Sequence, residues 1–190
     1  MAKILGNFHL ALGIGVLLLI AAMFGLHGDQ LGQGYDWAQF VRYVHVFAGI
    51  LWIGLLYYFN FVQIPTMPTV PAELKPGVSK YIAPKALFYF RWGAALTVLT
   101  GLLLAWVNDY EGEALTFQEG FRLIGTGMWL ALIMAFNVWF VIWPNQKRAL
   151  GLVEADDASK AKSARTAMIF SRINTLLSIP MLYAMTAFRW

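Results

Sequence analysis

The chain has 190 residues, of which 59% are hydrophobic and only 13% are charged. Soluble globular domains hold about 45–50% apolar and about 25% charged residues, so the composition excludes a disordered chain, a nucleic-acid-binding protein and an ordinary cytosolic enzyme. The net charge of +4 comes from basic residues that lie mostly between apolar runs. Because the chain has no cysteine, thiolate catalysis, cysteine-ligated zinc, Fe–S clusters and covalently attached haem are excluded too.

Five apolar runs are long enough to cross a membrane as helices, because about 18–25 residues span a hydrocarbon core of about 30 Å. In chain order the runs lie at 7–27, 42–62, 85–107, 121–143 and 166–188. They predict an all-α integral membrane protein, a bundle of five transmembrane helices that forms a single domain over 1–190. The first run has one lysine before it and no small-residue cleavage pattern after it, so we expect a retained helix rather than a signal peptide.

The loops between the runs differ in charge. The loops at 65–84 and 144–165 hold seven of the basic residues: Lys75, Lys80, Lys147, Arg148, Lys160, Lys162 and Arg165. The segments at 27–41 and 108–120 instead hold Asp29, Asp36, Asp109, Glu111, Glu113 and Glu119. Lysine and arginine favour the cytoplasmic side of a membrane. The sequence therefore predicts a multi-pass protein of the bacterial inner membrane with a cytoplasmic amino terminus.

Five polar residues fall in the part of the runs nearest the predicted cytoplasmic side, and they are Asn60, Arg91, Asn137, Arg172 and Asn174. No aspartate or glutamate occurs within any run, so the two arginines lack an obvious carboxylate partner. Arginine binds planar anionic groups bidentately, which predicts a site for a substrate carboxylate or enolate, a haem propionate, a quinone oxygen or a lipid phosphate. In the alternative interpretation the arginines snorkel to the headgroups and the asparagines join helices.

The histidines suggest a second site, near the outer face. Non-covalent haem b with two histidine ligands needs them on different helices at similar depth, with small residues that admit the macrocycle. His27 and His45 lie near the predicted outer ends of the first two runs, and Gly49 and Gly54 follow His45 on its helix. His45 is therefore the candidate iron ligand and His27 its candidate partner. The alternative is a His45 that only hydrogen-bonds a neighbouring carbonyl or hydroxyl.

A short internal echo links the second and fourth runs. Asn60 follows a phenylalanine and precedes Pro65, while Asn137 follows a phenylalanine and precedes Pro144. Each of these asparagine–proline segments is followed by a basic loop and then by an apolar run with an arginine in its first third. The echo favours a parallel repeat of two hairpins, with the first run as an addition.

Three segments resemble the membrane domain of bacterial urate hydroxylases, the urate oxidase N-terminal family: RYVHVFAGILWIGLLYYFNFVQIP at 42–65, FNVWFVIWPNQK at 136–147 and SRINTLLSIPMLY at 171–183. The resemblance implies urate oxidation with electrons passed to a cytochrome c pool. Fuller members continue into further helices and a cytochrome c domain. This sequence has no C-x-x-C-H motif, so we expect it to lack that domain and to use a separate cytochrome c.

The leading hypothesis is thus a redox-linked inner-membrane protein that binds haem or an anionic planar ligand. His45 is then a haem ligand or a proton-transfer group, and the arginine–asparagine band holds the anion. The alternative hypothesis is a non-catalytic accessory subunit of a larger respiratory or photosynthetic membrane complex. The sequence singles out no catalytic residue, and it leaves open whether the chain is an enzyme.

Overall fold

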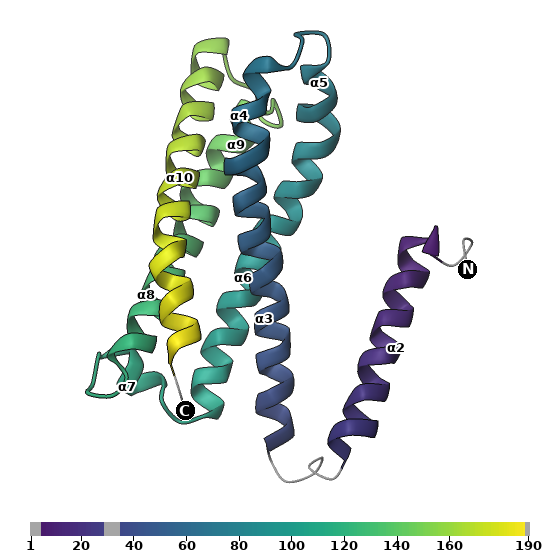
Figure 1. Ribbon diagram of the computed structural model, residues 1–190. Coiled ribbons are helices and arrows are strands. Elements are labelled where there is room, and N and C mark those ends of the chain that lie inside the picture. Colours follow the sequence, from purple (N-terminus) through teal and green to yellow (C-terminus); the bar gives the residue numbers. More distant parts are fainter. Residues whose placement is uncertain (1–4, 29–34, 189–190) are drawn as a thin grey trace. The chain divides into compact units, whose positions relative to one another are not determined.

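The computed structural model describes residues 5–28 and 35–188, and within those ranges it contains helices and no strand (Figure 1). The chain divides into two compact units, Met1–Phe40 and Val41–Trp190. The first unit contains α2 (Phe8–His27), which begins where the Asn7 side chain accepts hydrogen bonds from the backbone N–H groups of His9 and Leu10. Asparagine is a favoured residue at this capping position.

The second unit is an up-and-down bundle. Its elements in chain order are α3 (Tyr35–Tyr57, which begins in the first unit), η2 (Tyr58–Gln63), α4 (Ile64–Thr66), η3 (Met67–Thr69), α5 (Lys75–Gly77), η4 (Val78–Ile82), α6 (Ala83–Val107), α7 (Glu111–Leu115), α8 (Arg122–Phe136), η5 (Asn137–Ile142), α9 (Trp143–Ala149) and α10 (Asp157–Ala187). Figure 1 shows α3 and α8 leading to the end where α4, α5 and α9 lie, and α6 and α10 returning from it.

Five helical segments are long and apolar enough to cross a membrane, which confirms the predicted fold class. Four of them extend past the apolar runs. The segments cover Phe8–Leu26, Trp37–Thr69, Lys75–Val107, Arg122–Ala149 and Asp157–Ala187. The difference arises because hydropathy detects only the apolar part of a helix. Most of the additional residues form polar helical turns at the basic end of the bundle.

Three π-helical turns (η2, η4 and η5) each end two residues before a proline, namely Pro65, Pro84 and Pro144. The residue before each proline donates its backbone N–H to the carbonyl five positions back: Ile64 to Phe59, Ala83 to Val78 and Trp143 to Val138. Proline has no N–H, and its ring crowds the carbonyl four positions back. A wider turn relieves that crowding without ending the helix. The sequence echo around Asn60 and Asn137 thus corresponds to a shared π turn.

Helices α3 and α6 pack closely through small residues. Gly93, Thr97, Gly101 and Ala105 occupy every fourth position of α6. A Cβ added at Gly93 would lie 3.3 Å from the backbone nitrogen of Trp52, whose side chain is fully buried. Stripes of small residues are typical of helix contacts in membranes. Lipid tails are as apolar as a large side chain, so helices associate through close backbone packing and not through hydrophobic burial.

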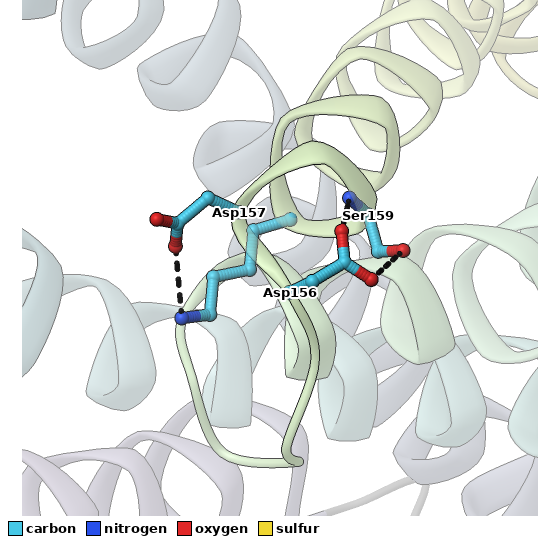
Figure 2. A network of polar contacts seen from close by, with 4 residues as sticks. Asp156, Asp157 and Ser159 are labelled. Carbon is cyan, nitrogen blue, oxygen red and sulfur yellow. Dashed lines mark hydrogen bonds and ion pairs between the residues drawn. The ribbon is translucent and has the colours of Figure 1, made fainter.

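Helix α10 begins nine residues before the apolar run because Asp156 caps it. Figure 2 shows Asp156 Oδ1 accepting from the backbone N–H of Ser159 at 2.8 Å and Oδ2 accepting from its hydroxyl at 2.7 Å. These hydrogen bonds to the ionised carboxylate lower the pKa of Asp156. Lys160 also pairs with Asp157 at 3.4 Å.

The opposite end of the bundle is closed by α7 and an aromatic cluster. A Cβ at Gly125 would collide with the backbone carbonyl of Ala114, so only glycine lets α8 pass so close to α7. The ring of Tyr110 stacks on Phe121, with centroids 5.9 Å apart, and lies 5.9 Å from the ring of Phe188. This cluster buries Tyr110 where the chain turns from α6 into α7.

Candidate functional site

Polar side chains join the helices inside the bundle. Asn137 in η5 donates to Asn174 Oδ1 at 2.9 Å, and Asn174 donates to the carbonyl of Met134 at 2.9 Å. Asn174 is fully buried and Asn137 is 7% exposed. Two of the predicted ligand residues therefore bind each other and link α8–η5 to α10. This pairing is the interhelical role that the alternative interpretation assigned to them.

Asn60 lies in η2 and ties that π turn to α10. Its amide nitrogen donates to Ser171 Oγ at 2.8 Å and to the carbonyl of Leu56 at 2.9 Å. Its Oδ1 is buried and accepts no hydrogen bond from the described residues. Two turns farther along α10 from Ser171, the hydroxyls of Tyr57 and Ser178 bond at 2.9 Å. Asn60 thus keeps one free acceptor inside the bundle.

Arg91 in α6 is a buried cation in the part of the bundle nearer the basic loops. Its guanidinium carbon lies 3.4 Å from the centre of the Trp143 ring, and the residue is 9% exposed. Such a cation–π contact stabilises the guanidinium plane. Nη1 is buried and has no hydrogen-bond partner among the described residues. The same holds for Oε1 of Gln63 and of Gln146.

Arg172 lies apart from this core. It is exposed, whereas Asn174, Ser171 and Ser178 of the same helix are buried. Residues two positions apart lie about 200° apart around a helix, so Arg172 and Asn174 occupy different faces of α10. The structure therefore does not bring Arg172 into the buried set of asparagines.

His45 is held against α6. Its Nδ1 lies 2.9 Å from the carbonyl oxygen of Thr97 and 3.3 Å from Thr100 Oγ1. A carbonyl can only accept, so Nδ1 carries the proton and the neutral ring presents Nε2 as a lone-pair donor. A Cβ at Gly101 would lie 2.8 Å from Cε1, so the ring packs directly on the glycine backbone. The ring itself is partly exposed.

The His27 side chain lies outside the described residues, so the His27–His45 pair stays a prediction. The described residues contain no group of three or more histidine, aspartate or glutamate side chains that could hold a metal ion. His45 is thus a single candidate ligand with a fixed tautomer.

Several residues of the core were missed by sequence analysis. Trp143, at the end of the fourth apolar run, was not singled out, but its ring supports Arg91. Ser171 and Ser178 flank Asn174 at helical spacing and are buried with it. Polar residues spaced three and four positions apart in an otherwise apolar helix lie on one face. From this spacing the buried face of α10 could have been predicted.

Comparison with known proteins adds one finding. Residues 113–189 match the model of a family described as urate oxidase N-terminal. The matched segment runs from α7 to the end of α10, and so contains Asn137, Trp143 and Asn174. No curated protein and no solved structure matches the chain.

Proposed function

We propose, from the match of residues 113–189 to the urate oxidase N-terminal family, that this multi-pass membrane protein is redox-linked and binds haem or an anionic planar ligand. The family match supports the redox role. A separate cytochrome c is the electron acceptor in this proposal.

The observation that carries the proposal is the buried Nη1 of Arg91, for which the described part of the chain offers no hydrogen-bond partner. A buried charge is costly unless an opposite charge and hydrogen bonds compensate it. Trp143 covers one face of the guanidinium, but a ring offers no acceptor in the guanidinium plane. An anionic oxygen at Nη1 supplies both the charge and the hydrogen bond. The family makes urate, a planar anion at neutral pH, the ligand to test first.

In this proposal His45 would be the residue that holds the haem iron, through Nε2. The Nδ1–H bond to Thr97 fixes the tautomer in which Nε2 is free to bind iron, as partners of metal-binding histidines commonly do. Gly101 lets the ring approach α6 closely, because a Cβ at this position would lie 2.8 Å from Cε1 of His45. Haem, when bound, supplies one-electron transfer. Thr97 and Gly101 then orient the imidazole and limit its rotation.

The haem proposal is tested with a dithionite-reduced minus oxidised visible spectrum of the detergent-purified protein. We expect a b-type haem signal that is lost in His45→Ala. Thr175→Ala is a suitable control, because its hydroxyl bonds only within α10, and it should keep the signal. A flat wild-type spectrum, or an unchanged signal in His45→Ala, would contradict ligation by His45.

The anion proposal is tested by equilibrium dialysis of the purified protein against radiolabelled urate. Hydrogen bonds to charged groups contribute about 1.5–3 kcal/mol, so we expect Arg91→Gln to weaken binding roughly 10- to 100-fold. Arg91→Lys keeps the charge but loses the planar fork, and should bind with intermediate affinity. The matched control is Lys85→Gln, which removes an exposed cation from the same helix.

The two tests also separate the main proposal from its alternative. Binding of urate without a haem signal would support the anion site and contradict the haem proposal. A protein that binds neither urate nor haem, and co-purifies with a larger complex, is better described as an accessory subunit.

A further inference from the structure

Helix α10 has two faces of opposite character. Its buried face carries the polar core residues Ser171, Asn174 and Ser178. Its exposed face carries Arg172 among large apolar side chains: Ile169 and Ile173 beside it, and Leu176, Ile179 and Tyr183 farther along. A charged side chain on an apolar face of a membrane-spanning helix needs a partner, because burying an isolated charge in lipid is costly.

A second arginine lies on the same stripe. Arg165 precedes Arg172 by seven residues, which is two turns and about 10 Å along the axis, and it is also exposed. Side chains on a helix tilt toward its amino terminus, so Arg172 reaches back toward Arg165. Neither side chain has a hydrogen bond or ion pair with the described residues.

The partner is not a carboxylate of this chain's spans. None of the five predicted apolar runs holds an aspartate or glutamate, so a second copy packed on this face would set Arg172 against apolar side chains. A phospholipid has the required chemistry, since its phosphate is an anion at the headgroup level and its acyl chains match the isoleucines and leucines below.

We propose that the exposed face of α10 binds an anionic phospholipid, whose phosphate lies between Arg165 and Arg172. The acyl chains then run along Ile169, Leu176 and Ile179 toward the middle of the membrane. The site is separate from the buried core around Arg91, and the proposal does not depend on the proposed function.

The test is native mass spectrometry of the full chain in detergent with added phosphatidylglycerol and phosphatidylcholine of equal acyl length. Each basic residue near a membrane surface contributes about 1 kcal/mol of attraction to anionic lipid, which is about a fivefold change in binding. We expect the wild type to prefer phosphatidylglycerol, and Arg172→Gln to retain about fivefold less of it. Arg172→Lys should be intermediate.

Lys85→Gln is the matched control, because it removes one exposed basic residue at the same end of the bundle but from α6. It should leave phosphatidylglycerol binding unchanged. Equal retention by Arg172→Gln and the wild type would overturn the proposal, and so would equal losses in Arg172→Gln and Lys85→Gln. Loss of a co-purifying polypeptide from Arg172→Gln, with lipid binding unchanged, would assign the face to a protein partner. Circular dichroism of each variant checks that the helices are intact.

Discussion

At the scale of single residues, Tyr110 shows burial and a nearby charge acting in opposite directions. It lies outside the membrane-spanning segments, between α6 and α7. Burial in the aromatic cluster raises the pKa of Tyr110 to about 12, although the positive charge of Arg42 lowers it. Burial dominates because the tyrosinate would lose its hydration inside the cluster.

This shift predicts how stability depends on pH. The unfolded chain ionises its tyrosines near pH 10, whereas folded Tyr110 stays neutral to about pH 12. The stabilisation from neutral Tyr110 is therefore complete below pH 10 and is lost as the pH rises toward 12. Absorbance titration at 295 nm should show a phase with a midpoint of about 12 that is missing from Tyr110→Phe. In Arg42→Gln the midpoint should move higher, and a lower midpoint would contradict the assigned role of Arg42.

Arg91 and Arg172 show what the sequence could and could not predict about the site. Their presence in apolar runs, and their lack of acidic partners, were visible in the sequence. For Arg172 the sequence held a signal, because Ser171, Asn174 and Ser178 indicate that the other face of α10 is buried. For Arg91 it held none, because the lipid-facing and buried faces of a membrane helix can be equally apolar and then give no amphipathic contrast. The contact of Arg91 with Trp143 joins residues 52 positions apart along the chain, in the same way as His45 joins Thr97. Such contacts depend on the packing of whole helices.

At the scale of elements, the existence of the helices was predictable and their ends were not. Apolar length predicts a membrane span, and five such segments are present. The start of α10 depends instead on a local hydrogen bond, because Asp156 satisfies the backbone N–H of Ser159. An aspartate followed three residues later by serine is a start signal that hydropathy does not register.

The stability of the first turn of α10 depends on pH through the carboxylate of Asp156. Its pKa is lowered by the hydrogen bonds from Ser159, so the cap contributes most above the ordinary pKa of an aspartate. The contribution is lost as the pH falls through the lowered pKa of the folded state. At neutral pH the first turn of α10 is therefore fully capped.

At the scale of the whole molecule, the charge distribution predicts an orientation. The amino terminus and the basic loops are expected in the cytoplasm. Because the natural chain has no cysteine, single introduced cysteines report their own accessibility. Ala72 and Gln118 are both exposed and lie at opposite ends of the bundle.

The measurement is labelling of bacterial cells with a membrane-impermeant maleimide. We expect Gln118→Cys to react in intact cells and Ala72→Cys to react only after permeabilisation. The reverse pattern would place the basic loops outside. Labelling of both variants after permeabilisation is the control that each introduced thiol can react.

The π turns before Pro65, Pro84 and Pro144 have a consequence for how the chain tolerates changes in length. A π turn holds one residue more than an α turn over the same rise, so it equals a single-residue insertion that the helix has absorbed locally. The direction in which side chains point before the π turn is therefore independent of their direction after it. The side chain of Asn137 can face the core whatever face the basic turns after Pro144 present. At these three places a one-residue deletion can be taken up by conversion to an α turn, while elsewhere in the same helices it would rotate every later side chain by about 100°.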